Sequence, residues 1–183
     1  MINSASPAFI LIFLVFQPGV TTAIIGAICY AALSRIPTAG WVKTGICLAC
    51  AFAGAVLFAA MGNVSGTGPL YLFAVLFFIF SGPLICLSPL FILAERNDFA
   101  PYAGYPAIMA ALFCAAATTG LIQILNINAF IAAGASVLAP GMLYLISFTI
   151  MAGIQVVLSA EFFMIAVAVQ RRRQEIREET PTE

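Results

Sequence analysis

The chain has 183 residues, of which 63% are hydrophobic and 8% charged; seven Lys and Arg balance seven Asp and Glu, and histidine is absent. A soluble domain has about 25% charged residues, nucleic-acid binding needs a basic surface, and many zinc and nucleophilic centres use histidine. The composition therefore predicts an all-α integral membrane protein with no nucleic-acid partner, and we expect no catalytic residue, metal or cofactor.

Long stretches without a charged side chain predict the membrane spans. A spanning helix needs about 20 apolar residues, because each residue advances about 1.5 Å across a hydrocarbon core of roughly 30 Å. Five segments meet this requirement, and they form one transmembrane domain over residues 1–170, with spans at about 8–33, 44–62, 70–94, 106–126 and 141–169.

The first predicted span is interrupted by Gln17-Pro18-Gly19, which Thr21 and Thr22 follow. Proline removes one helical hydrogen bond and leaves a carbonyl oxygen free one turn earlier. In lipid that oxygen must find a partner, so it faces other helices or a water-filled cavity. The polar residues here could therefore help to bind an ion or small solute, or they could simply satisfy the backbone of a kinked helix.

The second span contains Cys47 and Cys50 in a C-x-x-C arrangement. We interpret them as small apolar side chains rather than a redox pair, because the other three cysteines are scattered over separate spans. Small residues also recur every four positions, which favours close helix packing at the centre of the bundle or at a subunit interface. They are Gly45, Ala49 and Ala53 in the second span, and Ala107, Ala111, Ala115 and Thr119 in the fourth.

The third span carries a second break, Ser81-Gly82-Pro83, which falls on the first one when the sequence is shifted by 64 residues. The same shift aligns the loop Pro37–Trp41 with the loop Pro101–Tyr105. This weak repeat predicts a duplicated helical hairpin, with spans one and two followed by spans three and four in the same orientation. Such repeats occur in transporters, where matched breaks mark the binding site. They are also a simple way to build a bundle.

After the fourth span, Asn126 and Asn128 predict a turn, and the apolar segment 127–140 is too short to cross the membrane. We expect this segment to be re-entrant or interfacial and to precede the fifth span. The fifth span then contains Glu161, ten residues before Arg171 and so about 15 Å inside the cytoplasmic end of a straight helix. A carboxylate at that depth is a functional hypothesis by default, although it could also be a hydrogen bond between helices.

The basic residues predict the orientation. Arg35 and Lys43 lie in the first loop, Arg96 in the third, and Arg171 to Arg173 follow the last span. The positive-inside rule places all of them in the cytoplasm. Five spans satisfy the rule if the N-terminus is outside a plasma (inner) membrane and the tail, 171–183, continues the last helix into the cytoplasm.

The predicted function is that of a transporter or channel for a small solute or ion. The candidate binding residues are polar groups beside the breaks and on the last span: Gln17, Thr21, Thr22, Ser81, Gln155 and Glu161. The alternative is a non-catalytic structural or assembly subunit of a larger membrane complex. In both cases the partners are the lipid bilayer and either further copies of the chain or other subunits.

Overall fold

The computed structural model describes residues 7–61, 69–96, 98–134 and 140–179, with side chains described for 16–60, 79–96, 98–122, 142 and 145–178. The described chain is all-helical, as predicted, and contains no strand. Its five helices are α1 (Pro7–Ser34), α2 (Gly40–Met61), α3 (Pro69–Glu95), α4 (Tyr105–Gly134) and α5 (Pro140–Glu179).

Four stretches of the described helices are long and apolar enough to cross a membrane. They lie in α1, α2, α4 and α5, over Phe16–Ser34, Gly40–Ala60, Tyr105–Ile122 and Leu145–Glu178. In α3 the described apolar stretch is shorter, Ile79–Glu95. The helical make-up is that of a membrane protein.

The fourth helix differs from its prediction, because α4 continues through Asn126 and Asn128 and ends at Gly134. Asparagine lowers helix propensity by a fraction of a kcal/mol and does not break a helix as proline does. The predicted turn at the two asparagines is therefore absent, and the first half of the expected re-entrant segment is helical. Residues 135–139 lie outside the described part of the chain.

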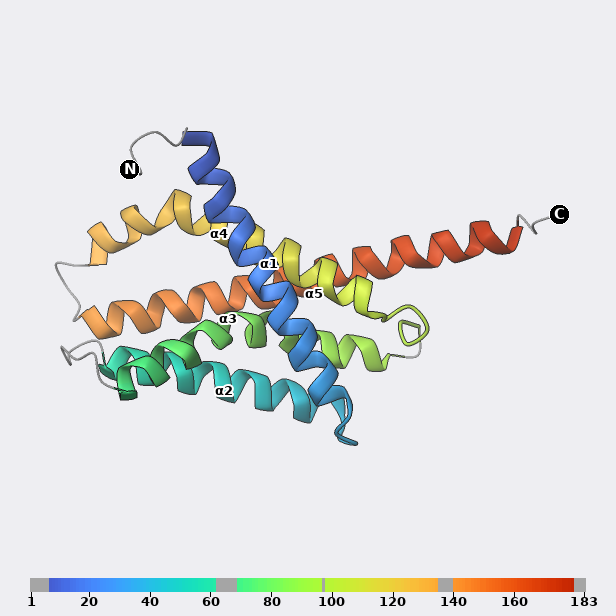
Figure 1. Ribbon diagram of the computed structural model, residues 1–183, viewed down its shortest axis with the longest axis horizontal. Coiled ribbons are helices and arrows are strands. Elements are labelled where there is room, and N and C mark those ends of the chain that lie inside the picture. The colour runs from blue at the N-terminus through green and yellow to red at the C-terminus, as the bar shows by residue number, and fades with distance from the viewer. Residues whose placement is uncertain (1–6, 62–68, 97, 135–139, 180–183) are drawn as a thin grey trace.

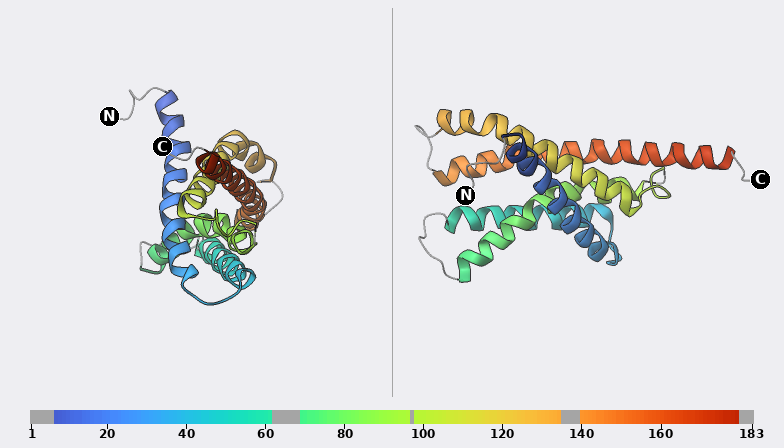
Figure 2. Two further views of the ribbon diagram at one scale, coloured as in Figure 1. Left: turned by 90° about the vertical axis from the view of Figure 1, so that its right-hand side faces the viewer. Right: turned by 45° about the horizontal axis from the view of Figure 1, so that its top comes forward.

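The helices pack in a different order from their order in the sequence. The most extensive interface joins α2 to α3, while α1 lies across α4, and α5 packs on both α4 and α3. Figures 1 and 2 show α1 crossing the other helices at a steep angle. The pairing of α1 with α2 and of α3 with α4 that a duplicated hairpin predicts is thus not among the main interfaces of the described residues.

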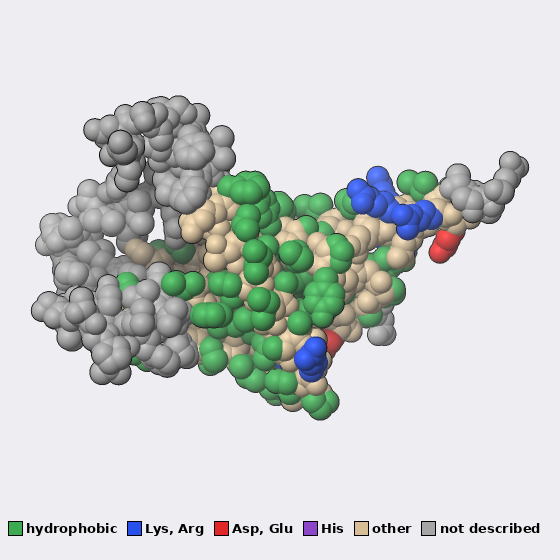
Figure 3. Space-filling view, viewed as in Figure 1, with side chains coloured by type: hydrophobic (Ala, Val, Ile, Leu, Met, Phe, Trp, Pro, Cys, Tyr) green, Lys and Arg blue, Asp and Glu red, His purple; other side chains and the backbone are tan. Residues whose placement is uncertain are grey.

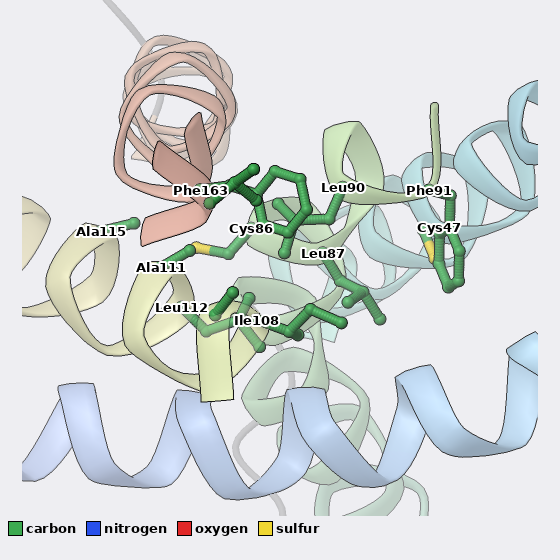
Figure 4. Packing of buried hydrophobic residues seen from close by; sticks show 12 residues of the cluster. Cys47, Cys86, Leu87, Leu90, Phe91, Ile108, Ala111, Leu112, Ala115 and Phe163 are labelled. Carbon is green, nitrogen blue, oxygen red and sulfur yellow. The ribbon is translucent and has the colours of Figure 1, made fainter. Parts of the chain in front are cut away.

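The core lies where α3, α4 and α5 meet. Cys86, Ala111 and Phe163 come together there, each fully buried (Figure 4). The small-residue stripe of α4 is part of this core, as predicted: Ala107, Ala111, Ala115 and Thr119 are all buried. The corresponding stripe of α2 is not, because Gly45, Ala49 and Ala53 are exposed and the opposite face of that helix is buried.

The charged segments gather at one end of the molecule. The connections after α1 and α3 lie at the end from which α5 projects (Figure 1). The Lys and Arg side chains visible on this face lie toward the same end, beside a largely apolar surface (Figure 3). The tail continues α5 as a helix, as predicted, so that α5 has 40 residues and is about 60 Å long.

Candidate functional site

In α3 a hydroxyl group satisfies the carbonyl oxygen that Pro89 leaves free. Pro89 lacks an N–H and therefore leaves the carbonyl oxygen of Ile85 without its helical donor. The hydroxyl of Ser88 donates to that oxygen at 2.8 Å, and Ser88 is buried. At this position the polar neighbour of the proline satisfies the backbone of its own helix.

Two further hydroxyls join α3 to α2. The hydroxyl of Ser81, which is buried, donates to the carbonyl oxygen of Ala51 at 3.1 Å. Seven residues along each helix toward the charged end, or about two turns, the hydroxyl of Thr44 donates to the carbonyl oxygen of Ser88 at 2.6 Å. Ser81 was a candidate binding residue, and in the structure its donor proton contributes to helix packing.

The break in α1 packs against α4 instead. A Cβ added at Gly19 would come within 2.9 Å of the Phe113 ring, so the two helices approach closely where the chain passes Pro18. Gln17 is exposed, Thr21 is partly buried and Thr22 is buried. Within the described residues the hydroxyl of Thr22 has no hydrogen-bond partner.

The structure places the remaining two candidates, Gln155 and Glu161, on α5, where Gln155 is half-buried and Glu161 exposed. Ala152 packs with Ala51 and Ile85, so Ala152 is the part of α5 that lies at the depth of the α3 break. Glu161 lies nine residues further along the helix, about 14 Å closer to the charged end. The six predicted residues are therefore spread over α1, α3 and α5 and lie at different depths, with Gln17 and Glu161 exposed.

Glu161 lies on the outer surface of the bundle. It belongs to a line of exposed residues on α5 that we call the outer face: Ile146, Ile150, Gly153, Val157, Glu161, Met164 and Ala168. The three- and four-residue spacings place these side chains on one side of the helix. Every other member is apolar or glycine, and a Cβ at Gly153 would meet nothing within 4 Å. A single carboxylate thus interrupts an apolar, uncovered helix face.

Lys43 is more buried than a loop residue. It lies in the first turn of α2, 9% exposed, with its Nζ 5.7 Å from the centre of the Phe91 ring. A cation over an aromatic face is stabilised by the ring quadrupole. The aliphatic part of the side chain packs between α2 and α3, while the ammonium group stays near the charged end of the bundle.

The cysteines do not form a pair. Cys47 is buried and Cys50 is exposed, so the C-x-x-C residues face different surroundings on α2. Cys86 is in the core, and all five cysteines are free thiols. This agrees with their interpretation as small apolar side chains. In the described residues no group of three or more Cys, Asp or Glu could hold a metal ion.

A groove of about 320 Å³ between α4 and α5 was not predicted from the sequence. Pro106, Ala107, Ala110 and Cys114 line it from α4, and α5 supplies Phe162, Ile165, Ala166, Val169, Gln170 and Arg173. The two helices run antiparallel along it, so Pro106 lies at the Arg173 end and Cys114 at the Phe162 end. The small residues that form it were visible in the sequence, but which of them would stay uncovered was not.

No protein-family model, curated protein or solved structure matches the chain.

Proposed function

We propose that the protein is a non-catalytic subunit of a larger membrane complex and binds a transmembrane helix of another protein through the outer face of α5. The observation that supports this is the exposed position of Glu161 in an otherwise apolar face. A charged side chain facing hydrocarbon costs at least a few kcal/mol. A partner that covers Glu161 removes that cost, whereas lipid does not.

The depth of Glu161 defines the partner's chemistry. Cys114 and Phe162 lie at the same level in the α4–α5 groove, about ten residues in from the start of α4. A second copy of the chain offers no cation at that level, because residues 1–34, 44–94 and 99–160 carry no charge. We therefore propose that the partner helix belongs to a different protein and presents a Lys or an Arg to the carboxylate.

Site-specific cross-linking tests the proposal. A photoreactive amino acid at Val157 or Met164, both on the outer face, should capture one partner in native membranes, and the cross-linked peptide should contain a basic residue within a span. The matched control is Val56, which is equally exposed but lies on α2. Capture from Val56 alone, or capture of a partner span without a basic residue, contradicts the proposal.

Substitution of the carboxylate gives the second arm. Glu161→Ala should remove the partner from the complex purified in mild detergent, since breaking a buried pair costs about 3 kcal/mol, or roughly 100-fold in affinity. Glu175→Gln is the control, because Glu175 is an exposed carboxylate of the tail. Exchanging the charges of Glu161 and its partner should restore assembly. If Glu161→Ala purifies with the partner as the wild type does, the proposal is wrong.

Transport of a small solute or ion is the second candidate function. It is supported by Thr22, which is buried one turn after Pro18 and has no hydrogen-bond partner within the described residues. Transport by the predicted residues requires that Glu161→Gln and Thr22→Val abolish ion flux in proteoliposomes while expression and assembly stay intact. The subunit proposal expects no such flux from the purified wild-type chain.

We further propose that the helix pair α3–α4 is a duplicate of the pair α1–α2. In this arrangement the first helix of each pair packs on the second helix of the other pair. At the 64-residue shift, the α1–α4 interface corresponds to the interface of α3 with α2. Gly19 packs on Phe113, and their equivalents lie within two residues of Ser81 and Ala51, which share a hydrogen bond. The similar placement of these contacts supports an internal repeat whose first helices pack on each other's second helices.

We also propose a membrane topology, which follows from the positions of the basic residues. All five helices cross a plasma (inner) membrane, the N-terminus lies outside, and the charged end of the bundle faces the cytoplasm. Arg35, Arg96 and the arginines of the tail then share one side, which supports this orientation.

A further inference from the structure

The groove between α4 and α5 has a polar mouth and an apolar floor. Its only polar lining residues with long side chains are Gln170 and Arg173, and both lie at the end nearest the start of α4. From Pro106 to Cys114 the floor extends for eight residues, about 12 Å along the helix. Polarity therefore changes along the groove as it does along a phospholipid that lies parallel to the helices.

We propose that this groove binds an anionic glycerophospholipid of the charged-end leaflet. The phosphate meets the guanidinium of Arg173 and the amide of Gln170, and one acyl chain lies against Ala110, Cys114 and Ile165. A guanidinium matches the phosphate group with paired hydrogen bonds, which an ammonium cannot do. The apolar contacts bury the acyl chain and contribute binding free energy, and the arginine selects an anionic headgroup.

The other charges of the tail support this assignment. Arg171 is paired with Glu175, its Nε lying 3.3 Å from the carboxylate. Arg173 has no carboxylate partner within the described residues. It also lines a second hollow, of about 300 Å³, together with Gln170, Gln174 and Arg177. Because Gln170 and Arg173 belong to both hollows, donors continue beyond the groove on the same side of α5.

A lipid accounts for these features better than a second helix does. Arg173 lies near the membrane surface, where anionic lipid headgroups are abundant and attract basic side chains. A helix in the groove would have to compete with those headgroups for Arg173. The groove is centred about 100° around α5 from Glu161, at Phe162 and Val169, and it meets the outer face at Ile165. The lipid proposal is tested at Arg173 and Ala110, which do not belong to the outer face, so its failure is distinguishable from failure of the partner proposal.

Native mass spectrometry of the delipidated full chain in detergent tests the proposal. We expect phosphatidylglycerol to bind more tightly than phosphatidylcholine with the same acyl chains. Arg173→Gln should weaken phosphatidylglycerol binding about fivefold, which corresponds to one basic residue near the headgroup. Arg172→Gln is the matched control, because Arg172 neighbours Arg173 in sequence but does not line the groove. An equal effect of the two variants, or equal binding of the two lipids, overturns the proposal.

The acyl-chain part of the site has its own variant. Ala110→Phe should fill the groove and weaken phosphatidylglycerol binding, while the helical circular dichroism and the melting temperature stay near those of the wild type, because Ala110 is exposed. Glycerol 1-phosphate, which has the headgroup chemistry without the chains, should not displace the lipid at equal concentration. Displacement by glycerol 1-phosphate, or unchanged lipid binding by a folded Ala110→Phe variant, overturns the proposal. If Ala110→Phe does not fold, the comparison of Arg173→Gln with Arg172→Gln decides.

Discussion

The hydroxyl of Ser88 donates a 2.8 Å hydrogen bond to the carbonyl oxygen of Ile85, the acceptor that Pro89 leaves without a helical N–H. A buried carbonyl oxygen left without a hydrogen-bond donor costs about 1–3 kcal/mol. The serine therefore makes the proline compatible with a buried helix. This relationship explains how α3 remains helical through Pro89 without a ligand at that position.

The first prediction follows directly. Ser88→Ala should lower the free energy of unfolding by about 1–2 kcal/mol, because the Ile85 carbonyl oxygen loses its donor. In a Pro89→Ala background the helical N–H returns, so the same serine substitution should cost less. Unfolding in mixed micelles, followed by circular dichroism, measures this double-mutant cycle. An equal cost in both backgrounds would show that Ser88 does not compensate for the proline.

Two glycines of α2 should respond in opposite directions to the same substitution. A Cβ at Gly40 would lie 2.7 Å from the carbonyl oxygen of Phe91, which belongs to the backbone and cannot move aside, so Gly40→Ala should destabilise the α2–α3 interface. At Gly45 a Cβ would meet nothing within 4 Å. Gly45→Ala should therefore stabilise the helix by up to about 1 kcal/mol. Thermal unfolding of both variants in one detergent compares them.

The small residues of α4 and α2 provide a similar contrast. Ala111 is fully buried between helices, so Ala111→Leu should cost about 1–3 kcal/mol through overpacking. Ala53 is exposed on α2, so Ala53→Leu should leave the stability of the isolated chain unchanged. If Ala53→Leu nevertheless disrupts the protein in native membranes, the α2 stripe is itself covered by another subunit. Blue native electrophoresis separates that outcome from unfolding.

The proposed topology gives a prediction that does not depend on how the side chains pack. With the N-terminus outside and an odd number of spans, green fluorescent protein should fluoresce when fused after Glu183, and alkaline phosphatase there should be inactive. The reverse is expected for fusions before Met1. Active phosphatase at both ends would require an even number of spans and a different assignment for α3.

The bounds of most helices could be predicted from the sequence, because membrane thickness sets their length and polar or proline-containing segments mark their ends. The predicted span 8–33 compares with Pro7–Ser34 for α1, and 70–94 with Pro69–Glu95 for α3. The end of α4 was predicted wrongly because Asn126 and Asn128 were treated as breakers. The start of α2 was predicted four residues late, since Lys43 was assigned to a loop although it packs on Phe91.

Which helix faces meet could not be predicted, because lipid and protein interior are both apolar and a membrane helix carries no polar side to mark its surface. Ala49 and Cys47 are two residues apart and chemically similar, yet the first is exposed and the second buried. For the same reason Glu161 was recognised as unusual from the sequence, but its position on the outside of the bundle was not. Only the packing of α5 on α3 and α4 determines that position.

The length of α5 has a mechanical consequence. A helix of 40 residues that continues without interruption from the spanning segment to the arginines is long enough to act as a lever. If it tilts by about 10° around its centre, each end of a rod of about 60 Å moves by about 5 Å. Binding of a partner or lipid to one side of α5 within the membrane can thus displace the tail. The helix between the binding site and the tail need not change its structure.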